Sequence, residues 1–383
     1  MGPGTFISAA LRGAFSVPRG RPIYALFQVT ARCNLACRMC SVWEEGARTP
    51  DLSPEAMGRV AENLAKAGVL LVNLAGEPLL RNDLPRIVAA FSRRGIQVRM
   101  QTNATLALRH RVRVAEAIRA GLTGVSVSLD TLVPGKQAWI CRTEGVWEEI
   151  VEGVATCAEL LPGGGAAVQL NCVVSGVNLE ELPDLVRFAQ EAGVWIAFSP
   201  IHVSGPGRED PQFARTLPPE FQLGPADALR IDDVFRRVMR MRARGAPVAN
   251  SREFLERTRR FLAEGPTPIP CHAGTRYLFI DHTGGVAPCH DLPADLRADS
   301  PDFVRTLSSR AWRRRARAAR AACPGCLLPC WIELSALLRR PYTGLGLTAR
   351  RLAARRRSGT DAGVRVRIAA APHRERPWNG GSS

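Results

Sequence analysis

Residues 23–40 read IYALFQVTARCNLACRMC, a run of mostly apolar residues that passes directly into three closely spaced cysteines. The first part, Ile23–Thr30, predicts a strand. The loop after it carries Cys33, Cys37 and Cys40 in a Cys-x3-Cys-x2-Cys spacing. Three thiolates on one loop can ligate three irons of a cubane iron–sulfur cluster and leave the fourth iron open. The alternatives are a zinc knuckle that lacks its fourth ligand, or three incidental buried cysteines.

The chain from Pro22 to about Pro200 alternates β-rich runs with amphipathic helical stretches. This alternation predicts an α/β fold of βαβ units, whose right-handed crossovers close toward a barrel or an open partial barrel. Reactive groups are then expected at the C-terminal ends of the strands. The predicted strands are Ile23–Thr30, Leu70–Leu74, Gln97–Thr102, Gly124–Leu129, Val168–Val174 and Val194–Ser199. The predicted helices are Ser53–Ala67, Asn82–Arg94, Arg111–Ala120, Val146–Leu161 and Glu180–Ala192.

Local signals mark several helix ends. Ser53 is a predicted N-cap with Pro54 at the next position, where its missing N–H costs nothing. Gly95, Gly121 and Gly193 follow three of the helices, and we expect them to end these helices.

Composition limits the class of protein. The chain has 383 residues, of which 46% are hydrophobic and 23% charged, so it can bury a sizeable core and wholesale disorder is excluded. It has no run of the about 18 apolar residues that a membrane span needs, and Met1–Pro22 lacks a signal-peptide pattern. We therefore expect a cytoplasmic protein. Its eleven cysteines should be reduced there, which makes metal or cluster ligation their leading use.

Positive charge is concentrated at the C-terminal end. Arg305–Ser383 contains 18 arginines and three acidic residues, whereas the rest of the chain is nearly neutral. Trp331–Arg340 and Leu345–Arg357 can each form a helix with a narrow apolar stripe, suited to an anionic membrane surface or an acidic partner. The alternative is a solvated basic extension. Nucleic acid is not favoured, because the tail lacks interleaved aromatic residues.

A second group of cysteines follows the linker-like run 265–270. Its members are Cys271, Cys289, Cys323, Cys326 and Cys330, and Gly284-Gly285 permits a tight hairpin that returns Cys289 to the side of Cys271. These residues predict a small module stabilised by a metal centre, either an iron–sulfur cluster or a four-cysteine zinc site. The remaining cysteines, Cys141, Cys157 and Cys172, fit no ligand spacing and are expected to pack as small apolar side chains.

Five segments follow from these patterns. They are an N-terminal extension (1–21), a core barrel (22–205), a helical connection (206–270), a cysteine-rich domain (271–331) and a basic tail (332–383) whose end is expected to be disordered.

The first three cysteines, with the run NLAGEP at 73–78, resemble the radical S-adenosylmethionine (radical SAM) superfamily. The resemblance implies a partial (βα)6 TIM-like barrel over about 22–200. It also implies a 4Fe–4S cluster whose open iron is chelated by S-adenosylmethionine. Reduction by a donor such as flavodoxin or ferredoxin would then release a 5′-deoxyadenosyl radical that abstracts hydrogen from a substrate.

The same resemblance implies roles for further residues. Glu77 would accept a hydrogen bond from the methionyl amino group, and Ser128 with Arg142 would hold the methionyl carboxylate. Asn103 would line the cofactor or substrate pocket, and Met39 stands where the family usually has an aromatic residue against the adenine. Asn171 and His202 are weaker candidates near the last two strands.

The spacing Cys-x12-Gly-x4-Cys, a gap, then Cys-x2-Cys resembles the SPASM and twitch modules of this superfamily. The resemblance implies one auxiliary 4Fe–4S cluster on Cys271, Cys289, Cys323 and Cys326, with Cys330 as a spare or replacement ligand.

Several functions remain open at this stage. The first expectation is a radical SAM oxidoreductase that tailors a small polar metabolite. A maturase of a ribosomal peptide is an alternative, weakened because only about 22 residues precede the barrel, and a lipid-tailoring enzyme is another. A zinc-stabilised nucleic-acid-binding protein is the alternative from a different class.

Overall fold

The computed structural model describes residues 21–45, 49–202, 217–267, 269–323, 325–329 and 332–335. These residues form a mixed α/β fold around one nine-stranded sheet in the order β6-β5-β4-β3-β2-β1-β7-β8-β9. The strands are β1 (Tyr24–Gln28), β2 (Leu71–Ala75), β3 (Gln97–Thr102), β4 (Leu122–Ser128), β5 (Val168–Val174), β6 (Trp195–Pro200), β7 (Tyr277–Ile280), β8 (Gly285–Ala287) and β9 (Leu296–Arg297).

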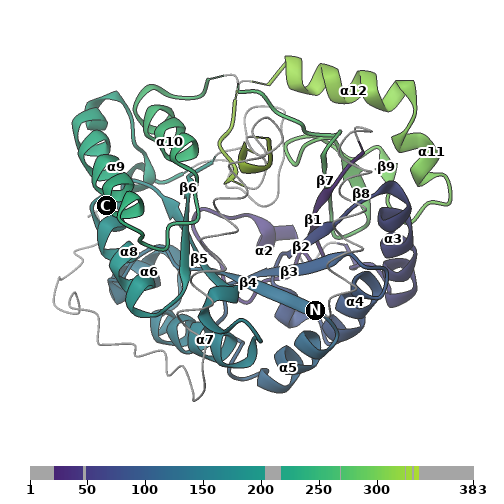
Figure 1. The fold of residues 1–383 in the computed structure, drawn as a ribbon, viewed down its shortest axis with the longest axis horizontal. Coiled ribbons are helices and arrows are strands. Elements are labelled where there is room, and N and C mark those ends of the chain that lie inside the picture. Colours follow the sequence, from purple (N-terminus) through teal and green to yellow (C-terminus); the bar gives the residue numbers. More distant parts are fainter. Residues whose placement is uncertain are drawn as a thin grey trace.

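The first six strands are parallel, and each lies beside its predecessor in the chain. They curve into a partial barrel with most of the helices on its convex side, whereas the short helix at Val42–Glu45 lies within the curve (Figure 1). The helices are α2 (Val42–Glu45), α3 (Pro54–Ala67), α4 (Leu84–Ser92), α5 (Arg111–Arg119), α6 (Pro134–Cys141), α7 (Val146–Leu160), α8 (Leu182–Glu191), α9 (Ala228–Ala243), α10 (Arg252–Glu264), α11 (Phe303–Leu307) and α12 (Arg310–Ala321).

The two faces of the curved sheet differ in what covers them. In β5 the residues alternate between buried and partly exposed, and the buried ones, such as Leu170 and Cys172, join the core between sheet and helices. The other face of the sheet is concave and carries polar side chains such as Gln101 and Ser128, which line a cavity. Apolar packing therefore lies outside the barrel, and a polar surface lies inside it.

The predicted elements of the barrel are confirmed. All six strands are present within two residues of their predicted ends, and so are the five helices. Ser53 caps α3 by accepting a hydrogen bond from the Ala56 amide. Gly95, Gly121 and Gly193 have φ of +70°, +117° and +66°, a left-handed backbone that glycine adopts at low cost after a helix.

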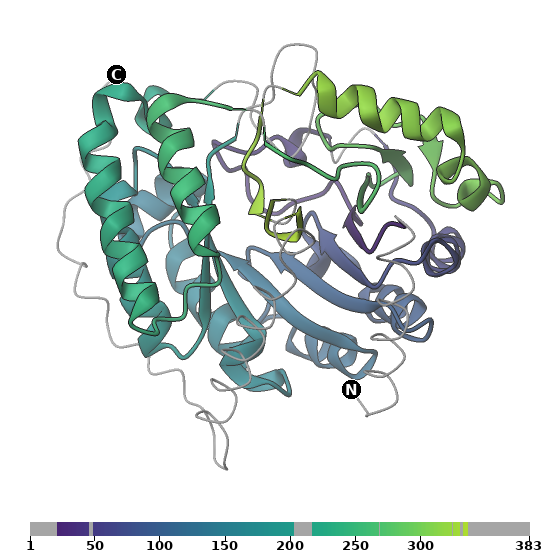
Figure 2. The ribbon, with the colours of Figure 1, turned by 45° about the horizontal axis from the view of Figure 1, so that its top comes forward.

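The cysteine-rich segment continues the barrel sheet. Strand β7 pairs with β1 in parallel, and β7 and β8 form the expected hairpin, in which Gly284 has a φ of +91°. Helix α11 packs on α3 and α12 follows it, both over the β7-β8-β9 end of the sheet (Figure 2). The edge of β1 is therefore covered by the chain itself.

Two regions of the predictions fall largely outside the described residues. The extension 1–20, Cys330, Trp331 and the tail from residue 336 onward are not described, so the expected tail helices are not addressed by the structure. Among the described helices, none is long and apolar enough to span a membrane.

Candidate functional site

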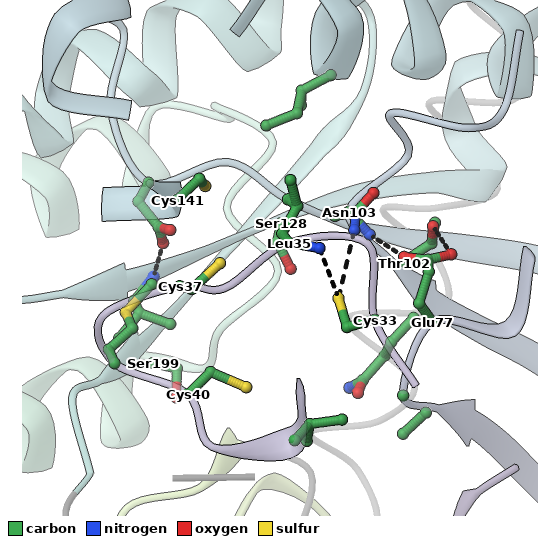
Figure 3. Close-up of a pocket in the computed structure, with 18 of the residues that line it drawn as sticks. Cys33, Leu35, Cys37, Cys40, Glu77, Thr102, Asn103, Ser128, Cys141 and Ser199 are labelled. Atoms are coloured by element: carbon green, nitrogen blue, oxygen red, sulfur yellow. Dashed lines mark hydrogen bonds between the residues drawn. The ribbon is translucent and has the colours of Figure 1, made fainter. Parts of the chain in front are cut away.

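A cavity of about 230 Å³ opens at the C-terminal ends of the parallel strands. Cys33, Cys37 and Cys40 all line it, and their sulfur atoms surround the same opening (Figure 3). The cavity walls combine these thiols with polar side chains from the ends of β2 to β6. The polar members are Glu77, Gln101, Thr102, Asn103, Ser128, Asp130, Gln137, Ser199 and His202.

The cysteine loop is fixed by hydrogen bonds to two neighbouring segments. The Arg38 amide donates to the Ile140 carbonyl (2.9 Å), and the Arg38 Nε donates to the Trp139 carbonyl (2.9 Å). On the other side, Asn34 Nδ2 donates to Thr105 Oγ1 (2.9 Å). These hydrogen bonds fix the arrangement of the loop that carries the three sulfurs.

Cys33 and Cys37 of the loop are each difficult to ionise alone. Burial raises the pKa of Cys33 to about 11, although amide donors from Leu35 and Asn103 act in the opposite direction. A hydrogen bond with Cys141 and burial raise the pKa of Cys37 well above its ordinary value, and the neighbouring thiols add to the effect. Thiolates that are so costly to bury need positive charge between them, and bound iron supplies it.

Glu77 lies at the back of the same cavity and is only 1% exposed. Its Oε1 accepts from Thr102 Oγ1 (2.8 Å) and the Leu79 amide (3.2 Å), and its Oε2 accepts from the Asn103 amide (2.9 Å). Desolvation outweighs these bonds and raises the pKa of Glu77 to about 7. A cation that entered the cavity would stabilise the ionised carboxylate.

Gly76 allows the chain to reach Glu77 in this position. Its φ is +84°, and a Cβ at this residue would lie 2.1 Å from the Thr30 carbonyl oxygen. Only glycine fits so close to the end of β1.

Asp130 is a second buried carboxyl group on the cavity wall. Its Oδ1 accepts from the Val173 amide (2.8 Å), and burial raises its pKa to about 7. Sequence reasoning did not select it, although it ends the Ser126–Asp130 stretch from which Ser128 was chosen.

The structure brings most of the predicted site residues together. Met39, Asn103 and Ser128 line the cavity with the three cysteines and Glu77. Arg142 does not line it; this residue ends α6 in a left-handed conformation (φ +55°), is exposed and lies over the Trp43 ring at 5.8 Å. Asn171 is also outside the lining, whereas His202 belongs to it.

Sequence reasoning missed one further thiol. Cys141 was expected only to pack, as Cys157 and Cys172 do in the core. It is buried, but it also lines the cavity beside Cys37, with Gln137 Nε2 3.3 Å from its sulfur (Figure 3). The signal was absent because α6, which delivers Cys141, was not predicted.

Cysteines of the second group lie against side chains of β1 and β7. Cys271, Cys289 and Cys326 pack in one buried cluster with Tyr24, Leu26 and Tyr277. Cys323 is close enough to raise the pKa of both Cys271 and Cys326 electrostatically, after the larger effect of burial. Cys271, Cys289 and Cys326 in this cluster, with Cys323 beside them, could saturate a second metal centre.

Comparison with known proteins decides between the readings of the first thiol group. A model of the radical SAM superfamily matches residues 27–189. This part of the chain runs from the end of β1 through β5 and contains Cys33, Cys37, Cys40 and Glu77. These residues form a radical SAM domain. Proteins of this superfamily hold a 4Fe–4S cluster and S-adenosylmethionine, so the zinc-knuckle alternative is set aside.

Relatives and solved structures agree with this domain. Molybdenum cofactor biosynthesis protein 1 of Bos taurus is 35% identical over 174 residues, which cover 44% of this chain and 26% of that protein. GTP 3′,8-cyclase of Acidothermus cellulolyticus is 34% identical over 187 residues, 45% of this chain and 50% of that enzyme. The chain thus spans half or less of these relatives. The crystal structure of Streptococcus suis SuiB bound to S-adenosylmethionine has the same fold, with a TM-score of 0.57, 16% identity, and coverage of 79% of this chain and 68% of SuiB.

Proposed function

We propose that this chain is a radical SAM enzyme that abstracts a hydrogen atom from a small polar metabolite and oxidises it. The observation that carries the proposal is the convergence of Cys33, Cys37 and Cys40 on one cavity together with the buried carboxylate of Glu77, inside a domain that matches the superfamily. When bound, the cluster and S-adenosylmethionine supply a 5′-deoxyadenosyl radical.

The residues of the cavity have complementary tasks in this proposal. Cys33, Cys37 and Cys40 hold three irons, which compensate the electrostatic cost of three buried thiolates. Ionised Glu77 accepts a hydrogen bond from the methionyl ammonium. The Ser128 hydroxyl donates a hydrogen bond to the methionyl carboxylate. Arg142 is exposed and outside the cavity, so a partner for Ser128 in this task is not assigned.

We further propose one auxiliary cluster on Cys271, Cys289, Cys323 and Cys326. Its support is the packing of Cys271, Cys289 and Cys326 in one cluster with Cys323 beside them. Burial raises the pKa of Cys326 to about 12 and that of Cys289 well above its ordinary value. Four protein ligands leave no open iron, so this centre suits electron acceptance better than binding of S-adenosylmethionine. An acceptor of this kind favours oxidation of the substrate. Residues 271–331 then act as an auxiliary-cluster domain.

Polar side chains at several points of the cavity wall support a substrate that carries polar groups. Gln101, Asn103, Ser128, Asp130 and Ser199 offer donors and acceptors along the cavity wall. A nucleotide such as GTP belongs to this class, and the name of the Acidothermus relative makes it a rational first compound to assay.

The direct test is cofactor cleavage by anaerobically reconstituted protein. Reduced wild-type protein should convert S-adenosylmethionine to 5′-deoxyadenosine and methionine, and Cys37→Ala should lose this activity because one of three protein ligands is gone. Cys157→Ala, a change outside the cavity lining, is the matched control and should retain it. Undiminished cleavage by Cys37→Ala would contradict the proposal.

The auxiliary centre has a separate test. A variant in which Cys33, Cys37 and Cys40 are all alanine should keep about four irons per chain, with a spectrum that S-adenosylmethionine does not change. Zinc in place of iron in this variant would make the second centre structural and would remove the reason for preferring oxidation.

A further inference from the structure

A cluster of two histidines and an aspartate lies where the barrel meets the cysteine-rich segment. His202 follows β6 by two residues, and His290 and Asp291 follow β8. One ligand atom from each lies within 4.8 Å of the other two. The side chains are 10%, 1% and 6% exposed, respectively, and His202 lines the cavity described above.

The distances within this cluster also suit ligands of one shared metal ion. Asp291 Oδ1 lies 3.4 Å from His202 Nε2 and 3.7 Å from His290 Nε2. A charge-assisted N–H···O bond is about 2.7–2.9 Å long. Two ligands bonded to one divalent ion at about 2.1 Å and at a tetrahedral angle stand about 3.4 Å apart.

The surroundings of His290 also suit a ligand. Its Nδ1 faces Cys289 Sγ at 3.7 Å, so this nitrogen can direct its proton to the sulfur and leave the Nε2 lone pair toward Asp291. Metal-bound histidines commonly donate their other nitrogen in this way. The rings of Phe279 and His202 pack edge-on against His290, with centroids 6.3 Å and 5.7 Å away, and hold its orientation.

We propose that His202, His290 and Asp291 form a binding site for one divalent transition-metal ion of the zinc or ferrous class. Two imidazoles and a carboxylate are the ligands that such ions accept, and three protein ligands leave a coordination position open. Because His202 lines the cavity, the open position is available to an oxygen or nitrogen donor of a molecule bound there. The ion would act as a Lewis acid that orients this donor. The site is distinct from both thiol groups.

Zinc binding by the reconstituted enzyme tests the site. Protein with its iron–sulfur clusters in place is cleared of loose metal and dialysed anaerobically against a series of free Zn²⁺ concentrations. Zinc and iron per chain are then measured together. Wild-type protein should bind one saturable zinc without loss of iron. His202→Ala and Asp291→Asn should each weaken zinc binding at least about tenfold at unchanged iron content. His110→Ala, at the residue before α5 and outside the cavity lining, is the matched control and should bind zinc as the wild type does.

X-ray absorption spectroscopy at the zinc edge identifies the atoms bound to zinc in the wild-type protein and needs no variant. A shell of nitrogen and oxygen at about 2.0–2.2 Å, with no sulfur at about 2.3 Å, is expected for the wild type. A sulfur shell, or loss of iron as zinc binds, would assign the zinc to the cysteines and overturn the proposal. The proposal would also be overturned if the wild type bound no saturable zinc. Zinc binding by both variants that equals wild-type binding, at unchanged iron content, would overturn it as well.

Discussion

Because the pKa of Glu77 is raised to about 7, we expect binding of S-adenosylmethionine to depend on pH near neutrality, where an ordinary glutamate is fully ionised. The carboxyl group must be ionised to accept the methionyl ammonium, yet burial raises its pKa from 4.5 to about 7 in the unliganded protein. Affinity should therefore fall as pH decreases through 7. An unperturbed glutamate would produce the same loss only near pH 4.5.

The magnitude follows from the ionised fraction. With a pKa of about 7, about half of the unliganded protein carries an ionised Glu77 at pH 7, and about 3% does at pH 5.5. If only the ionised form binds, the apparent Kd rises by about fifteenfold over this interval. The measurement should stay below about pH 7.5, because an α-amino group itself begins to lose its proton there.

The assay is equilibrium binding of S-adenosylmethionine to oxidised, cluster-loaded protein between pH 5.5 and 7. Glu77→Gln should bind more weakly at pH 7 and should show no slope. Glu62→Gln, an exposed residue of α3 paired with Lys66, is the control and should keep the slope. Asp130→Asn should also keep it, which separates Glu77 from the other buried carboxyl group of the cavity. A flat wild-type profile, or a slope that survives in Glu77→Gln, would refute the reasoning.

Three further outcomes are expected from unliganded protein, measured by chemical denaturation. Arg81→Met should cost about 3–5 kcal/mol because it leaves the partly buried Asp83 without its cation and the Val29 and Leu52 carbonyls without a donor. Arg32→Met, at a side chain 51% exposed, should cost under about 1 kcal/mol, and equal costs would contradict this. Gly76→Ala should lower the free energy of unfolding by at least about 1–2 kcal/mol, because of the positive φ and the clash with Thr30. Gly58→Ala in α3, where a Cβ meets nothing within 4 Å, should raise the free energy of unfolding by about 0.5–1 kcal/mol. Burial raises the pKa of Asp130 from 3.8 to about 7, so its ionisation lowers the stability of the folded protein progressively as pH rises from about 4 to 7. Asp130→Asn should therefore be more stable than the wild type by up to about 4 kcal/mol at pH 8 and equally stable below pH 4. A stability difference that does not change with pH would argue against burial as the cause.

The barrel could be predicted from the sequence because its signals are local. A parallel strand such as β5 and a capped helix such as α3 are each specified by residues within their own bounds. The positions of Cys33, Cys37 and Glu77 followed for the same reason, since each comes directly after a strand whose C-terminal end faces the cavity.

The features that sequence reasoning missed depend on contacts between distant segments. Cys141 meets Cys37 because Arg38 bonds to the end of α6, about one hundred residues away. The same turn points the neighbouring Arg142 away from the cavity, against Trp43. The residue pattern within α6 does not predict either of these contacts. The cluster of His202, His290 and Asp291 is equally non-local, because it joins two loops separated by 89 residues.

Strand β1 connects the two thiol groups more directly than a linker between domains would. Its inner residues Tyr24 and Leu26 pack with Cys271, Cys289 and Cys326, and its C-terminal end leads into the loop of the first three cysteines. Its other edge pairs with β2, where Ala75 both lines the cavity and packs in the second cysteine cluster. Because β7 is bonded to β1 along four residue pairs, the second thiol group is positioned by the sheet itself. A substitution within β1 is expected to disturb both thiol groups.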